Sequence, residues 1–149
     1  MAFGPLPSTF RTTPTVIFGR GSVSELPDQL KRAGAGHVVV VTDSGVEASG
    51  ILDQVASLLD ESDISYGIYT EVVPEPPSPS VDACAEAIKA AGADVVVGLG
   101  GGSAMDTSQI AACLVTNGGK AEDWIGVEAL RKPGIPTISV PTTAGTASE

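Results

Sequence analysis

Short runs of apolar and β-branched residues recur along the chain, and glycine, proline or a small polar residue ends each of them. The most uniform run, Val38 to Val41, has no polar position, which is typical of a strand covered on both faces of a parallel sheet. Runs of this kind predict five strands, at residues 16–18, 37–42, 64–70, 94–97 and 137–140.

Apolar residues at helical spacing fill the intervals between these runs. Residues 51–59 place their apolar side chains at i, i+1, i+4, i+7 and i+8, which predicts a helix. The same periodicity predicts helices over residues 22–33, 81–88 and 104–115, with Ser78 or Ser80 as the cap of the second of these. Because strands and helices alternate, we expect an α/β fold of a Rossmann-like kind, with a mainly parallel sheet and helices on both faces.

Composition excludes several classes of function. The 149 residues carry 18 acidic and 8 basic side chains, a formal net charge of -10, which argues against nucleic-acid or anionic-membrane partners. No apolar run approaches the roughly 20 residues of a transmembrane helix, and no secretory signal is visible, so we expect a cytoplasmic protein. Cys84 and Cys113 lie in apolar patterns and are interpreted as core residues, and His37 as structural.

The segment Gly98-Leu99-Gly100-Gly101-Gly102-Ser103 follows a predicted strand and precedes a predicted helix. Glycines allow a ligand to approach the backbone closely, and a helix N-terminus presents free amides to an anion. No Lys or Arg lies between Lys89 and Lys120, so backbone amides would have to hold a phosphate there.

A purely structural interpretation of this turn remains open. Ser103-Ala104-Met105-Asp106 fits a capping box, with Ser103 at the N-cap and Asp106 at N3. Capping and phosphate binding are compatible because they use different amides. The segment fits neither the GxGxxG dinucleotide fingerprint nor a P-loop, and the chain has no GxSxG nucleophile elbow.

Two motifs together resemble the iron-containing, or group III, alcohol dehydrogenase family. They are Gly-Gly-Gly-Ser-x-x-Asp, from Gly100 to Asp106, and Pro-Thr-Thr-Ala-Gly-Thr-x-Ser-Glu, from Pro141 to Glu149. Earlier landmarks occur in the family's order, namely Phe18 to Ser22, Val41 to Asp43 and Val73 to Pro76. The resemblance covers nearly the whole chain.

The resemblance implies that residues 1–149 form a dinucleotide-binding domain, whereas a helical C-terminal domain supplies the metal in the family. It implies that Gly101, Gly102 and Ser103 hold the pyrophosphate and that Asp43 binds the adenosine ribose, which favours NAD over NADP. The alternative for Asp43 is a structural Asp after a strand. The cofactor-binding residues implied are Asp43, Gly100, Gly101, Gly102, Ser103, Asp106, Thr142, Thr143 and Thr146.

Three positions depart from the family pattern. Gln109 stands where the family often has Lys, Ala147 where it usually has Gly, and Glu75 where it often has Asn. These departures leave the expected subgroup and local contacts open.

The implied reaction is hydride transfer between an alcohol or aldehyde and NAD, in a homodimer or larger homo-oligomer. Family members polarise the alcohol with a metal, usually iron, held by one Asp and three His beyond the last motif, and one histidine cannot supply that set. Thr146 to Glu149 is a capping-box pattern that announces a helix, so we expect a fragment of a longer enzyme, inactive alone. Alternatives are a maleylacetate reductase, a polyol dehydrogenase, a dehydroquinate-synthase-like relative, or a non-catalytic nucleotide-binding module.

Overall fold

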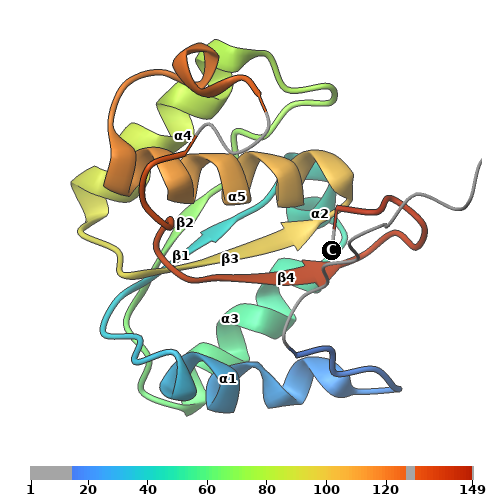
Figure 1. Cartoon of the computed structure of the whole chain (residues 1–149). Coiled ribbons are helices and arrows are strands. Elements are labelled where there is room, and N and C mark those ends of the chain that lie inside the picture. Colours follow the sequence, from blue (N-terminus) through green and yellow to red (C-terminus); the bar gives the residue numbers. More distant parts are fainter. Residues whose placement is uncertain (1–14, 127–129, 149) are drawn as a thin grey trace, which may run out of the picture.

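The computed structural model describes residues 15–126 and 130–148. Their central feature is a sheet of four parallel strands in the order β2-β1-β3-β4 (Figure 1). Val38 lies opposite Tyr66 on one side and Val95 on the other, which fixes the register of the three leading strands. The strands are β1 (Val38–Val41), β2 (Tyr66–Tyr69), β3 (Val95–Gly100) and β4 (Thr137–Pro141).

Helices connect the strands and cover both faces of the sheet, as the alternating pattern predicted. Figure 1 shows α1 and α3 against one face and α4 and α5 against the other. The helices are α1 (Leu26–Arg32), α2 (Ser44–Ala48), α3 (Ile51–Glu61), α4 (Ser78–Ala91) and α5 (Gly102–Asn117), with 3₁₀ turns η1 (Ser22–Glu25) and η2 (Ala121–Trp124). The expected α/β fold is therefore confirmed.

The valine runs explain why the two central strands are buried. Successive strand side chains point to opposite faces, so Val38 and Val40 pack with α1 and α3, whereas Val39 and Val41 pack with α4 and α5. All six positions of β3 are buried as well. A polar residue in these runs would face a helix rather than water, which is why the runs contain none.

The order of the strands creates a topological switch point between β1 and β3. The chain passes from β1 outward to β2 and then returns to β3 on the other side of β1. The loops after β1 and β3 therefore leave the sheet toward opposite faces, and the gap between them is where open α/β sheets bind ligands. Asp43 and Gly100 lie at these two strand ends.

Four local predictions were wrong. Residues 16–18 are not a strand; Val16 and Phe18 are 74% and 98% exposed, because no described strand pairs with them. Residues 44–48, for which no helix was predicted, form α2. Neither Ser78 nor Ser80 caps α4, whose N-cap is Pro77, and Ser80 Oγ instead donates to the Pro77 carbonyl.

The fourth error concerns the glycine turn. Ser103 is the second residue of α5 and not its cap, since the helix begins at Gly102 with Gly101 at the N-cap. Gly100, at a φ of 151° that other residues rarely adopt, lets the chain pass directly from strand to helix. Asp106 consequently lies beyond the position that a capping box requires.

The remaining sequence expectations for single residues can be followed in the structure. Cys84 is fully buried in the core on the α4 side, and Cys113 is half-buried; both are free thiols. The His37 ring bonds Ser65 Oγ at 2.7 Å, at the end of the sheet opposite to Gly100, which is a structural role. Within the described ranges, no helix combines the length and the apolar character that crossing a membrane requires.

Candidate functional site

The turn from β3 into α5 presents unused backbone amides. The first hydrogen bond of the α5 helix runs from the Met105 amide to the Gly101 carbonyl, at 3.1 Å. The three preceding amides, from Gly102 to Ala104, have no partner within the helix. No side chain caps Gly101, and the first turn of α5 contains no acidic residue. The start of this 16-residue helix is therefore electropositive and open to an anion.

Glycine is required at two positions of this turn. Gly100 has a φ of 151°, and a Cβ there would lie 2.8 Å from the Cβ of Ala104. A Cβ on Gly98 would overlap with the hydroxyl of Ser108, whose Oγ donates to the Met105 carbonyl at 2.7 Å. These glycines allow α5 to pack directly on β3, and this packing aims the helix N-terminus at the end of the strand.

The neighbouring helix α2 begins in the opposite way. Asp43 is its N-cap, and Oδ1 accepts hydrogen bonds from the amides of Gly45, at 2.8 Å, and Val46, at 3.0 Å. Oδ2 of Asp43 lies 3.4 Å from the point that a Cβ on Gly100 would occupy. One carboxylate oxygen thus holds α2, and the other faces the turn after β3.

The third segment at this edge is the threonine-rich loop after β4. The Thr142 amide donates to the Gly100 carbonyl at 2.8 Å, which extends the strand pairing to the edge of the sheet. Thr143 Oγ1 lies 3.5 Å from the position of a Cβ on Gly101, and Thr146 Cβ lies 3.4 Å from that of Gly102. The loop therefore lies beside the uncapped start of α5 (Figure 1).

These contacts show which of the residues singled out from the sequence come together. Asp43 lies against Gly100, Thr143 against Gly101 and Thr146 against Gly102. Ser103 is half-buried in the first turn of α5. Asp106 is exposed on that helix and makes no side-chain hydrogen bond or ion pair with the described residues.

One pocket borders the sheet and α3, and another borders the end of α5. The smaller, of about 250 Å³, adjoins Thr142 on the α3 side of the sheet. Its lining is mainly apolar and consists of Val23, Ile51, Gln54, Val55, Leu99, Val140, Pro141 and Thr142. This pocket therefore places an apolar surface next to Thr142 of the candidate site.

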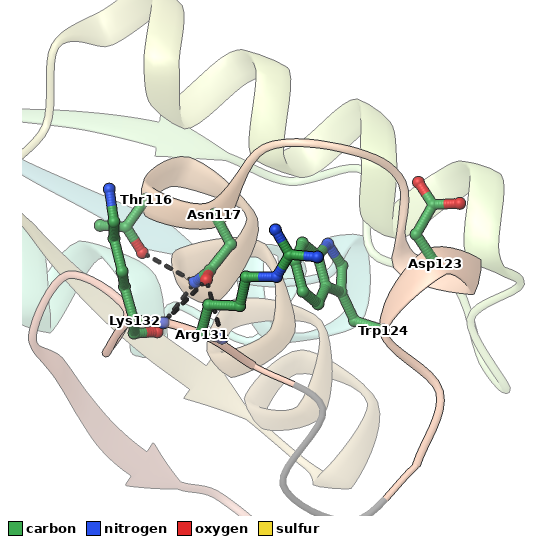
Figure 2. A pocket seen from close by; sticks show the side chains of 6 residues that line it. All are labelled: Thr116, Asn117, Asp123, Trp124, Arg131 and Lys132. Atoms are coloured by element: carbon green, nitrogen blue, oxygen red, sulfur yellow. Dashed lines mark hydrogen bonds between the residues drawn. The ribbon is translucent and has the colours of Figure 1, made fainter.

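The larger pocket, of about 420 Å³, lies elsewhere, near the C-terminal end of α5 (Figure 2). A helix of 16 residues is about 24 Å long, so this pocket is remote from the glycine turn. Asn117 uses its amide here to hold the backbone of Arg131 and Lys132. The Arg131 guanidinium covers the Trp124 ring, 5.7 Å from its centroid. These polar groups fasten Arg131 and Lys132 to the end of α5, and we interpret the pocket as structural.

The part of the chain that the structure describes contains no metal centre, and its buried Cys84 is not an activated nucleophile. Burial raises the pKa of the Cys84 thiol to about 12, so this cysteine stays protonated at neutral pH. Within residues 15–126 and 130–148, no three His, Cys, Asp or Glu side chains gather closely enough to hold a metal ion. What the site offers chemically is an anion cradle of backbone amides, flanked by hydroxyls and one carboxylate.

Comparison with known proteins decides the family. Residues 13–149 match the family model described as iron-containing alcohol dehydrogenase. The chain belongs to the iron-containing alcohol dehydrogenase family. The membership expected from the glycine and threonine motifs is thereby confirmed.

Relatives within this family of alcohol dehydrogenases include enzymes from yeasts and bacteria. The chain is 41% identical to alcohol dehydrogenase 4 of Schizosaccharomyces pombe over 89% of its own length and 32% of that protein. It is 33% identical to the NAD-dependent methanol dehydrogenase of Bacillus methanolicus, over 95% of the chain and 37% of that enzyme. The chain thus spans about a third of the length of these curated relatives.

A solved structure of the same family supports the fold. It is the sulfoacetaldehyde reductase of Bifidobacterium kashiwanohense in complex with NAD⁺, with a TM-score of 0.85 and 34% sequence identity. The similarity covers 97% of this chain and 38% of that one. The Rossmann-like arrangement of the described residues is therefore that of an alcohol dehydrogenase of this family.

Gln109 has a connecting role that the sequence did not indicate. The sequence distinguished it only as a departure from the family pattern, yet its Nε2 donates to the Ser148 carbonyl at 2.6 Å. That carbonyl lies 39 residues further along the chain. The one available signal was the position of Gln109 on α5, two helical turns after the glycines.

Proposed function

We propose that this chain binds NAD across the ends of β1, β3 and β4 and serves as the cofactor-binding domain of an alcohol dehydrogenase. The observation that carries the proposal is the uncapped N-terminus of α5, at the position where the strand order reverses. A dinucleotide pyrophosphate fits this place because its negative charge would be shared among several amides in a cradle without a Lys or Arg nearby in sequence.

The neighbouring residues fit the rest of a dinucleotide. In this proposal Gly101, Gly102 and Ser103 hold the pyrophosphate through their backbone, and Gly100 keeps the turn close to β3. The hydroxyls of Thr142, Thr143 and Thr146 line the side of the cofactor that faces the loop. Asp106, exposed on α5, is the remaining residue that we propose to face the cofactor.

In this proposal Asp43 determines the preference between NAD and NADP. Its Oδ1 holds α2, whereas Oδ2 faces the gap between β1 and β3. A ribose with free hydroxyls donates to such an oxygen, but a 2′-phosphate would place a second negative charge beside it. We therefore propose NAD rather than NADP.

For the whole protein we propose hydride transfer between an alcohol or aldehyde and NAD. The nicotinamide, when bound, supplies the hydride chemistry, and this chain's residues position it. The described residues do not fit an iron ion, because they include no cluster of three ligands. The implied iron must find its ligands outside these residues, whose own part is to bind and orient the cofactor.

We further propose a cytoplasmic location, supported by two free thiols, and a homo-oligomer, supported by the exposed apolar segment at Val16 and Phe18.

Titration of the purified chain with NAD, NADP and ADP, followed by calorimetry, tests the proposal. We expect NAD to bind more tightly than NADP, and ADP to compete with NAD. Since the chain carries a net charge of -10, moderate salt should leave the affinity unchanged or increase it. No binding at millimolar concentrations would refute the cofactor site. A steep loss of affinity with salt would instead indicate a cationic site, contrary to a cradle of amides.

A further inference from the structure

Gln109 links three segments of the candidate site. It lies on α5, and its Nε2 donates both to the Ser148 carbonyl at 2.6 Å and to Ser139 Oγ of β4 at 3.3 Å. The first contact spans 39 residues and the second 30, so neither follows from local chain geometry. Among the described residues, this is the side chain that hydrogen-bonds from α5 to both ends of the threonine loop.

The same loop end rests on the start of α5. Ser148 Oγ lies 3.3 Å, and Thr146 Cβ 3.4 Å, from the point that a Cβ on Gly102 would occupy. Ala147, between them, is held at a φ of 59°. Gln109 therefore fastens the loop at residue 148, and Thr143 and Thr146, which precede this point, lie beside the amides proposed to bind the pyrophosphate.

We propose that Gln109 is a positioning residue: by holding residue 148, it fixes Thr143 and Thr146 beside the cofactor. This inference rests on the proposed function. Gln109 itself need not contact NAD, because its donor group is already engaged by Ser148 and Ser139. Gln109 holds the loop in place before the cofactor binds. Binding then does not have to supply the free energy that ordering the loop would cost.

Three substitutions separate this role from general stability. Gln109→Met keeps the length and shape of the side chain but removes the donor. Gln109→Lys keeps a donor long enough to reach the Ser148 carbonyl. Gln29→Ala, on α1 at the other face of the sheet, is the matched control, because no side-chain hydrogen bond of Gln29 connects it to the site.

The readouts are NAD affinity by calorimetry and amide hydrogen exchange of the full chain. For Gln109→Met, we expect affinity to fall about three- to tenfold, the effect of losing one or two neutral hydrogen bonds. Exchange should quicken in residues 142–148 and stay unchanged in β3 and α4. Gln109→Lys should restore slow exchange and NAD affinity, and Gln29→Ala should change neither.

The outcomes distinguish this inference from the proposal on which it rests. If the unaltered chain does not bind NAD, the proposed function fails and the role of Gln109 in cofactor binding fails with it. If the unaltered chain binds NAD and Gln109→Met binds equally well, the positioning role alone is refuted. Faster exchange without a loss of affinity, or a loss that Gln109→Lys does not rescue, would refute it as well.

Discussion

Two exposed residues occupy backbone conformations that suit other amino acids better. Ala147 has a φ of 59° and Glu75 a φ of 48°, both in the left-handed region. These are two of the three positions at which the chain departs from the pattern that the resemblance implies, which usually has Gly at position 147 and often has Asn at position 75. We predict that Ala147→Gly and Glu75→Asn each raise the free energy of unfolding.

The conformations allow the size of the effect to be worked out. A left-handed residue with a Cβ costs about 1–2 kcal/mol, whereas glycine and, to a lesser degree, Asn adopt this conformation readily. Glycine also gives the unfolded chain more freedom, which offsets about 0.4–1 kcal/mol of the gain. We therefore expect about 0.5–1 kcal/mol from Ala147→Gly and about 1 kcal/mol from Glu75→Asn, since Asn carries no such offset.

Urea unfolding measures these differences. The fluorescence of Trp124, the chain's one tryptophan, and far-UV circular dichroism should give coincident transitions. The midpoint should rise in both variants without a change in slope. Two controls isolate the backbone conformation: Glu75→Ala keeps a Cβ and little tolerance for this φ, and Asp63→Asn replaces one tolerant residue at φ 54° with another.

The reasoning would be wrong if Glu75→Ala stabilised the chain as much as Glu75→Asn, because loss of the charged side chain would then explain both. It would also be wrong if Ala147→Gly lowered the midpoint, since the left-handed conformation would then cost less than the freedom that glycine gives the unfolded chain.

Four further predictions follow from the site and its support. Gly98→Ala should destabilise the chain by about 1–3 kcal/mol in urea unfolding, because its Cβ overlaps with Ser108; an unchanged midpoint would contradict that packing. Asp43→Asn should narrow the preference for NAD over NADP in calorimetry, yet leave stability within about 0.5 kcal/mol, since Asn caps α2 equally well. The free energy of unfolding should fall as pH rises from about 9 toward 12, because the Cys84 thiol ionises near 9 when unfolded but only near 12 when folded; Cys84→Ala should reduce that slope. Gly101→Asp should abolish NAD binding in calorimetry while raising the unfolding midpoint slightly, whereas Gly101→Ala should not raise it.

The layers of the fold could be predicted because burial leaves a direct mark on composition. A strand such as β1, covered on both faces, tolerates no polar residue, so its valine run shows in the sequence. The two edges of the candidate site were predictable for a similar reason. Gly100 to Gly102 and Thr142 to Thr146 follow apolar runs, and parallel strands bring such ends to one edge of the sheet.

Features that depend on a particular hydrogen bond or packing contact, local or distant, could not be predicted. Residues 44–48 have weak helix formers at Ser44 and Gly45, and the Asp43 cap holds these five residues as α2. The bond from Gln109 to Ser148 joins residues 39 positions apart, which no local pattern records. The prediction that Ser103 caps α5 was wrong. Its spacing to Asp106 fits a capping box, but the extent of β3 and its glycines determine where α5 begins.

The contrast between α2 and α5 bears on whether the glycine turn is only structural. The chain caps the five-residue α2 with a carboxylate, yet leaves the 16-residue α5 without any side-chain cap at the same edge of the sheet. Steric hindrance does not explain this, because Gly101 has an extended backbone, at φ -81° and ψ -167°, and a Cβ there would lie 3.5 Å from Thr143 Oγ1, an ordinary contact. A turn selected for stability alone would have Ser or Asp at that position, worth a few tenths of a kcal/mol over glycine. A side-chain oxygen of either residue at position 101 would occupy the amide of Ser103 or Ala104, and the carboxylate of Asp would also repel the ligand, so a pyrophosphate held by these amides excludes both. Opposite changes in stability and NAD affinity on Gly101→Asp would therefore favour the anion site, and a gain in stability without loss of binding would favour the structural turn.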